Sequence, residues 1–122
     1  MTTQQQQGLK VYEIKSKAID KPKLIERLAK TDLIGAMSMY VEDGGENTLH
    51  AHTGSDGFYI VFEGEATFYG EGDQIIAKVG PGEMVLVPRG TKYWFGKSST
   101  EQMVMLRVWA EVPNVKDERI RY

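Results

Sequence analysis

The chain has 122 residues, of which 41% are hydrophobic and 26% are charged, and its formal net charge is −2. This length fits one domain, the charge excludes a basic nucleic-acid surface, and no apolar run approaches the roughly 20 residues that span a bilayer. The sequence contains no cysteine, which excludes disulfides, thiolate ligands and a cysteine nucleophile, so any metal would depend on imidazole and oxygen ligands.

The beginning of the chain predicts a loose segment followed by a helix. Residues 1–8 contain a glutamine run without the apolar centre of a signal peptide, and we expect a flexible lead-in and a cytoplasmic protein. Residues 9–122 are predicted to form a single domain. Within it, residues 20–30 predict a short helix, because proline suits a first helical turn and the leucines and isoleucine that follow form an apolar stripe.

From Leu33 onward the pattern changes to short apolar or alternating runs separated by glycine-rich turns. The runs are LIGAMSMYV, TLHAH, GFYIVFEGEATFYG, QIIAKV, GEMVLVP, KYWFG and EQMVMLRVWAEV. With 13 glycines and four prolines as punctuation, they predict an all-β sandwich or barrel. The charged tail PNVKDERIRY either crosses the end of this barrel or extends into a partner subunit.

The only two histidines, His50 and His52, lie two residues apart in one of the predicted strands. Side chains alternate across a strand, so both imidazoles are expected on the same face. Such a pair can chelate a transition metal, or it can serve acid/base chemistry in a pocket. The histidine pair therefore marks the candidate site.

Two motif blocks surround this pair. The first runs from Gly44 through both histidines to Gly64, and the second runs from Gly82 through PRG to Lys97. Together they resemble the two signature motifs of the cupin superfamily over residues 33–110. The resemblance implies a double-stranded β-helix, or jelly-roll barrel, after the short N-terminal helix.

The resemblance also implies a metal site of two histidines and a glutamate from the first motif and a histidine from the second. Here Gly57 stands at the glutamate position and Tyr93 at the second-motif histidine position, so two of the four ligands are missing. Asp56 is expected to face the opposite way unless a bulge at Gly57 turns it inward. A weakly bound divalent metal (Zn, Ni, Fe, Mn or Cu) on His50 and His52, with Tyr93 as a further ligand, remains open beside metal-free chemistry.

Strand alternation extends the candidate pocket beyond the histidines. An inward Gly57 brings Tyr59 inward, and an inward Tyr93 brings Phe95 inward and sends Trp94 to the other face. The last long predicted strand has two alternating sets of side chains, and one of them faces the cavity. The first set is Met103, Met105, Arg107 and Trp109, and the second is Val104, Leu106 and Val108. If the set with Arg107 faces the cavity, this residue can clamp a carboxylate or phosphate. Besides Arg107, the side chains predicted to bind the substrate as an adaptable apolar wall are Phe95, Met37, Met39, Met105 and Trp109.

These residues favour a small enzyme that acts on a small polar organic molecule by lyase, dehydratase, isomerase or cyclase chemistry. His50 or His52 would be the base, and Tyr93 or Tyr59 the acid or oxyanion donor. The alternatives are a non-catalytic binding or sensing barrel and a metal-dependent dioxygenase with a relaxed two-histidine site. Because open sandwiches expose edge strands, a homodimer is expected, with Trp94, Trp109 and the tail as interface candidates.

Overall fold

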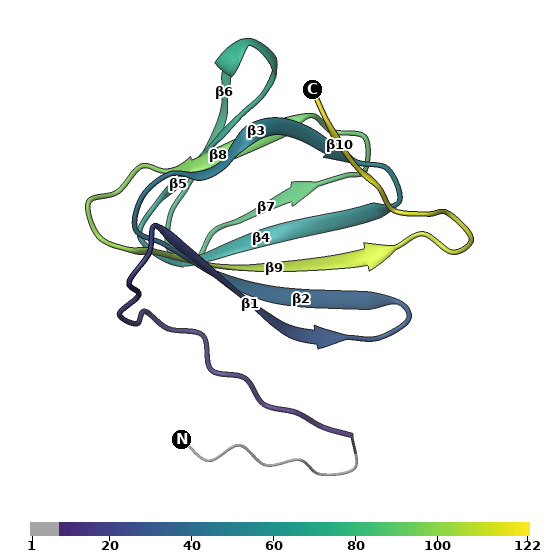
Figure 1. Ribbon diagram of the computed structural model, residues 1–122, viewed down its shortest axis with the longest axis horizontal. Coiled ribbons are helices and arrows are strands. Elements are labelled where there is room, and N and C mark those ends of the chain that lie inside the picture. The colour runs from purple at the N-terminus through teal and green to yellow at the C-terminus, as the bar shows by residue number, and fades with distance from the viewer. Residues whose placement is uncertain (1–7) are drawn as a thin grey trace.

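The computed structural model describes residues 8–122 and contains two five-stranded sheets that enclose a common core (Figure 1). The predicted flexible lead-in falls, apart from Gly8, outside the described residues. The strands are β1 Lys23–Lys30, β2 Ile34–Val41, β3 Gly45–His52, β4 Ser55–Glu63, β5 Ala66–Tyr69, β6 Ile75–Val79, β7 Met84–Val87, β8 Tyr93–Lys97, β9 Met103–Glu111 and β10 Arg119–Arg121. A single 3-10 turn, Glu71–Asp73, lies between β5 and β6.

The strand order confirms the predicted double-stranded β-helix. One sheet runs β1-β2-β9-β4-β7 and the other runs β10-β3-β8-β5-β6, with every pairing antiparallel. Strand β9 lies between β2 and β4, and β8 lies between β3 and β5, so strands far apart in sequence are neighbours. Such crossed connections are typical of a jelly roll. Among the described residues, no helix is long and apolar enough to cross a membrane.

The helix predicted for residues 20–30 is wrong, because most of this segment forms β1. It pairs antiparallel with β2 along seven residue pairs, with a bulge at Leu28. Leu24, Glu26 and Leu28 are half-buried and alternate with exposed residues, which is the period of a strand. Although leucine, glutamate, arginine and lysine favour helices, pairing with the free edge of β2 overrides this local preference.

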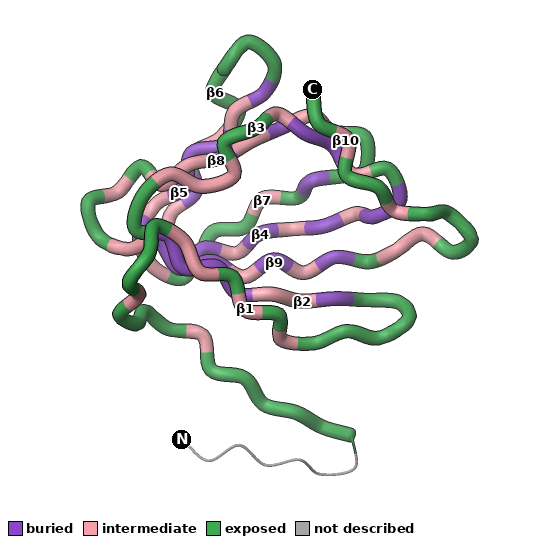
Figure 2. Tube along the Cα trace, viewed as in Figure 1, coloured by how far each residue is buried: buried purple, intermediate pink, exposed green. Residues whose placement is uncertain are grey.

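The core lies between the inward faces of the two sheets, as the buried segments in Figure 2 show. The alternating set of β9 that faces inward is the one that contains Arg107, which answers the question left open by the sequence. Its register partners on β2 and β4 also point inward. The buried apolar cluster consists of Met39, Val41, Tyr59, Val61, Ala66, Phe68, Val79, Val87, Tyr93, Phe95, Met103 and Met105.

The C-terminal tail turns back across the open end of the barrel, which is one of the two alternatives that the sequence left open. Strand β10 pairs with the end of β3, with Arg119 opposite His52 and Arg121 opposite His50. Trp109 points into the barrel, whereas Trp94 stacks on Tyr69 on the outside. All three interface candidates therefore have packing partners within the chain, and the homodimer stays a prediction.

Candidate functional site

A cavity of about 400 Å³ opens between the two sheets, at the end where β3 and β9 finish. Strands from both sheets and the returning tail contribute to its walls. The lining residues are Ile25, Arg27, Lys30, Met37, Glu46, His52, Tyr59, Arg107, Trp109, Glu111, Asp117 and Arg119. Five of the residues predicted for the site therefore meet in one cavity, which is large enough for a small organic molecule.

A bulge in β3 positions the histidine pair. Glu46 lies opposite Phe95 and His50 lies opposite Tyr93, so β3 uses two more residues than β8 over the same distance. The bulge leaves the Thr48 carbonyl free of the β3–β8 ladder, and His50 Nδ1 donates a hydrogen bond to it at 2.7 Å. This bond fixes the ring and leaves Nε2 without a proton in the neutral imidazole.

The two histidines occupy different depths. His50 is buried and does not line the cavity, whereas His52 is half-buried and does. Their rings meet edge to face with centroids 5.5 Å apart. On the other side of His52, its Nδ1 lies 3.9 Å from a carboxylate oxygen of Asp117. Thus His52 is the imidazole that a ligand would touch, with His50 behind it.

Both imidazoles are neutral at physiological pH. Burial lowers the pKa of His50. Burial also lowers the pKa of His52, to about 4, and the nearby positive charge of Arg107 is the second cause. A neutral imidazole offers a lone pair that can accept a proton or a hydrogen bond from a ligand.

Two tyrosines form a buried pair beside the histidines. The hydroxyls of Tyr59 and Tyr93 share a hydrogen bond of 2.7 Å, and the Tyr93 ring lies 4.5 Å from the His50 ring, centroid to centroid. Burial raises the pKa of Tyr93 and raises that of Tyr59 well above its usual range, so both phenols keep their protons. Tyr59 lines the cavity and Tyr93 lies behind it, which repeats the arrangement of the histidines.

Arg107 brings an unpaired positive charge to the cavity wall. Its side chain is largely buried, and its Nε has no hydrogen-bond partner among the described residues. The guanidinium carbon lies 4.9 Å from the centre of the Trp109 ring and 5.9 Å from that of Tyr59, within cation–π range. Buried charges usually have partners, so an unpaired guanidinium on a cavity wall is unusual.

Other predicted residues lie deeper than expected or on the outside. Met37 lines the cavity, but Met39, Met105 and Phe95 are fully buried in the core. Asp56 faces outward, as strand alternation predicted, and forms an ion pair of 2.8 Å with Arg89 on the surface. The wall that a ligand can reach is therefore smaller than the set of inward residues.

Several charged lining residues were missed from the sequence. Asp117 and Arg119 come from the tail, where the alternation of charged and other residues indicates a strand. Arg27 comes from β1, where the helix prediction concealed the strand period. The charges largely pair with one another: Lys30 lies 3.1 Å from Glu111, and Arg119 pairs with Glu46.

The side chains around the histidines do not fit a divalent metal. Among residues 8–122, no three histidine, aspartate or glutamate side chains are grouped closely enough to hold one. The expected carboxylate position is Gly57, and the space beside it holds the Arg107 guanidinium, which repels a cation. The remaining oxygen donor, Tyr93, keeps its proton because burial raises its pKa.

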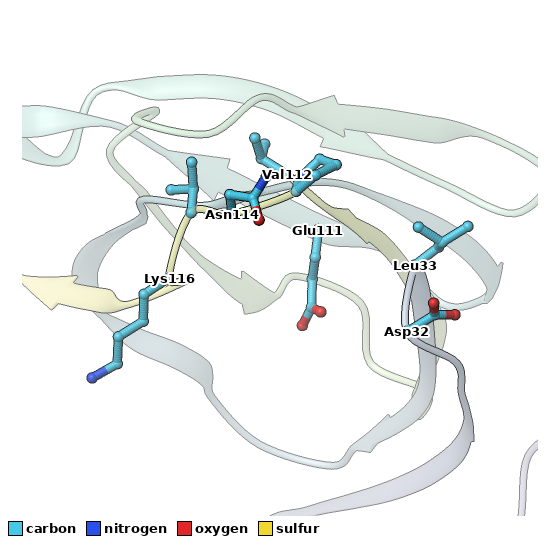
Figure 3. Close-up of a pocket in the computed structure, with 8 residues that line it drawn as sticks. Asp32, Leu33, Glu111, Val112, Asn114 and Lys116 are labelled. Atoms are coloured by element: carbon cyan, nitrogen blue, oxygen red, sulfur yellow. The ribbon is translucent and has the colours of Figure 1, made fainter.

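A second hollow, of about 520 Å³, lies outside the barrel between the β1–β2 turn and residues 111–116 (Figure 3). Asp32 and Glu111 contribute carboxylates to it, and Lys116 extends away from them. None of its lining residues is a histidine, tyrosine or arginine, so it offers less acid/base chemistry than the cavity inside the barrel.

Comparisons with known proteins agree on the fold. The family model described as "Cupin domain" matches residues 37–109, and no curated protein matches the chain. A Klebsiella pneumoniae protein with a double-stranded β-helix domain is 15% identical, has a TM-score of 0.68, and the match covers 87% of this chain and 90% of that one. KdgF from Halomonas sp. is 17% identical with a TM-score of 0.64 and coverages of 80% and 86%. A cupin-superfamily sugar phosphate isomerase from Silicibacter pomeroyi is 18% identical, with a TM-score of 0.58 and coverages of 73% and 68%.

Proposed function

Because this chain belongs to the cupin family, whose barrel encloses the cavity described above, we propose that it is an enzyme that moves a proton within a small polar organic molecule. The observation that carries the proposal is the pairing of a neutral imidazole, His52, with a protonated phenol, Tyr59, on the wall of one cavity. A base and an acid facing the same small space are the minimum for such a reaction.

The proposed reaction begins at a carbon next to a carbonyl group. His52 takes the proton from this carbon, and the electron pair left behind moves into the carbonyl, whose oxygen accepts a hydrogen bond or the proton from Tyr59. In an isomerisation, His52 returns its proton to the former carbonyl carbon, while the hydroxyl on the deprotonated carbon gives its proton to Tyr59 and becomes the new carbonyl group. In a dehydration, His52 gives its proton to a β-hydroxyl, which leaves as water as the carbonyl re-forms and Tyr59 regains its proton. Isomerase and lyase reactions thus share their first step.

His50 and Tyr93 support this pair from behind. The 2.7 Å hydrogen bond between the Tyr59 and Tyr93 hydroxyls holds the Tyr59 hydroxyl in place, and the His50 ring packs against both His52 and Tyr93. Asp117, on the tail, lies on the Nδ1 side of His52. The positive charge of Arg107 is one cause of the low His52 pKa. A bound anion would offset this charge and would raise the His52 pKa toward neutrality, where a general base works best.

One of the similar structures has a name that agrees with this chemistry, since it is called a sugar phosphate isomerase. We take the reaction type from the cavity residues, because similarity at this level of identity indicates fold alone. The same donor set gives no support to a two-histidine dioxygenase, since Gly57 and a guanidinium stand where a third ligand would be needed.

The shared first step can be tested by proton exchange. The protein is incubated in D₂O with a panel of aldose and ketose phosphates and keto sugar acids, and NMR follows replacement of C–H by C–D next to the carbonyl. We expect the wild type to exchange at least one class of these compounds. The variants His52→Gln and Tyr59→Phe should exchange roughly 100-fold more slowly, since positioned acid/base groups contribute factors of this size.

Tyr122→Phe is the matched control, because Tyr122 is exposed and its ring lies under Lys92, away from the cavity. This variant should exchange like the wild type. Undiminished exchange in His52→Gln would contradict the proposed base. Binding of a panel compound, seen as thermal stabilisation, without any exchange would instead identify a non-catalytic binding protein.

A further inference from the structure

Arg107 is the cavity residue whose chemistry the chain itself leaves unused. Its side chain is only 7% exposed, and its Nε has no partner among the described residues. It also lies beyond 4 Å from every carboxylate in residues 8–122. Leaving a buried charge unpaired costs free energy, and an anionic ligand in the cavity would supply the missing opposite charge to the guanidinium.

The absence of a side chain at Gly57 makes room for this guanidinium. A Cβ at Gly57 would lie 3.4 Å from Arg107 Nη2 and 3.3 Å from the Val108 carbonyl oxygen. Any side chain longer than a methyl group would extend into the space that the guanidinium occupies. Gly57 therefore allows a positive charge at this point of the wall.

Two aromatic rings lie within cation–π range of the Arg107 guanidinium. Trp109 and Tyr59 bring their rings to 4.9 and 5.9 Å from the guanidinium carbon. Contacts of this kind restrict a flexible side chain before a ligand arrives, so less entropy is lost on binding.

A second unpaired arginine lies in the same cross-strand row. Arg27 on β1 is opposite Met37 on β2, and Met37 is opposite Arg107 on β9, so all three side chains lie on one face of the sheet. Neighbouring strands are about 4.8 Å apart, which places the two arginine backbones roughly 10 Å apart. Like Arg107, Arg27 has no carboxylate within 4 Å among residues 8–122.

The acids of the cavity do not neutralise these two arginines. Glu111 pairs with Lys30, Glu46 pairs with Arg119, and Asp117 lies next to His52. Because His52 is neutral, Asp117 also lacks an opposite charge, and its carboxylate accepts a hydrogen bond from the Gly54 backbone N–H instead. The uncompensated positive charges of the lining are thus one deep guanidinium, Arg107, and one near the mouth, Arg27.

We propose that Arg107 and Arg27 form a two-point anion subsite, which binds a small organic dianion with one anionic group on Arg107 and the other on Arg27. The side chain of Met37, between them, packs against the short carbon chain of the ligand. This inference deepens the proposed function by naming the substrate class, and it rests on that function only in taking the ligand to be the substrate.

Calorimetry with three five-carbon probes tests the subsite: glutarate with two carboxylates, pentanoate with one, and the neutral glutaramide. We expect the affinity to fall in this order, with no binding of glutaramide. Arg107→Gln should weaken both acids roughly 10- to 100-fold, the range for a hydrogen bond to a charged group. Arg27→Gln should reduce glutarate to the affinity of pentanoate and leave pentanoate unchanged.

Arg89→Gln is the matched control, since Arg89 pairs with Asp56 on the outer surface, and it should bind glutarate as the wild type does. A thermal melt shows that each variant is folded. Wild-type protein that does not bind glutarate would overturn the proposal, as would an Arg107→Gln variant with full affinity.

Substitution at Gly57 gives an independent test. Gly57→Glu places a carboxylate beside Arg107 and should abolish glutarate binding, whereas Gly57→Gln adds the same bulk without charge and should retain more affinity. Equal losses in the two variants would contradict the role of charge.

Proton exchange separates this inference from the proposed function. Glutarate binding that depends on Arg107, together with absence of exchange for every panel compound, would uphold the subsite and refute the enzyme. Exchange that requires His52, but has the same KM in Arg107→Gln as in the wild type, would uphold the enzyme and refute the subsite.

Discussion

The two ends of the barrel are built from the same strands but have opposite character. Along the inward face of β9, Met103 and Met105 at one end are fully buried, whereas Arg107 and Trp109 at the other end line the cavity. The inward face of β4 changes in the same way, from Val61 through Tyr59 to a glycine. We call the first region the closed end and the second the open end.

The difference shows how a small barrel combines stability with a site. Apolar side chains from both sheets fill the closed end and hold the sheets together. At the open end, charged side chains, neutral imidazole and phenol groups and a cavity take the place of this apolar packing. Substitutions at the two ends should therefore separate effects on stability from effects on function.

The largest expected effect comes from a matched pair of methionines. Met103 is fully buried at the closed end, and Met37 is half-buried on the cavity wall. Met103→Ala should lower the free energy of unfolding by about 2–5 kcal/mol, because it leaves a cavity in a packed core. Met37→Ala should cost less than about 1 kcal/mol and should instead weaken glutarate binding. Urea unfolding measures both, and equal stability losses would contradict the distinction between the ends.

The next effect concerns the close approach of Gly35 to Trp109 at the open end. A Cβ on Gly35 would overlap the Trp109 indole ring, which packs against Arg107, so Gly35→Ala must shift the ring or the strand that carries it. We expect a loss of about 1–3 kcal/mol in stability, a change in tryptophan fluorescence, and weaker glutarate binding. Gly80→Ala is the control, because its Cβ would meet only Glu83 Oε1 at an ordinary 3.5 Å. An unchanged fluorescence spectrum in Gly35→Ala would contradict this packing.

The smallest effect is a dependence of stability on pH. The unfolded chain binds a proton at His52 near pH 6.5, but the folded chain binds it only near pH 4. Protonation therefore favours the unfolded state, so stability should stay level above about pH 7 and fall as the pH drops from 6.5 toward 4. With partial solvent screening the loss is on the order of 1 kcal/mol.

Urea unfolding at several pH values measures this loss. His52→Gln removes the titrating group and should flatten the curve, leaving the smaller contribution of His50, whose pKa is also lowered. A wild-type curve without a decline between pH 6.5 and 4 would show that His52 is not held neutral by burial.

The strand period was sufficient to predict most of the fold and part of the site. Alternation in β3, β4 and β9 placed His50 and His52 on one face and put Tyr59 on the same face as Gly57. Strand alternation does not show how far along the barrel axis each inward side chain lies. For this reason Phe95, Met39 and Met105 were predicted for the wall but lie in the core, while Arg107 and Trp109 reach the cavity.

The remaining parts of the site depend on tertiary pairing that local sequence does not encode. Residues of β1 favour a helix intrinsically, and only the edge of β2 makes them a strand, so Arg27 was missed. The tail reaches the site through pairing of Arg119 with His52 across a long sequence separation. The bulge that frees the Thr48 carbonyl for His50 likewise depends on the pairing of β3 with β8.

The central claim is that the open end works by proton transfer between neutral side chains and a bound anion, without a metal. The most direct test is proton exchange by wild-type protein before and after treatment with EDTA, with zinc, nickel, iron(II), manganese or copper then added back. We expect the exchange rate to be unchanged by EDTA and unimproved by any of these ions. Loss of exchange in EDTA and its recovery with one of these metals would contradict the account.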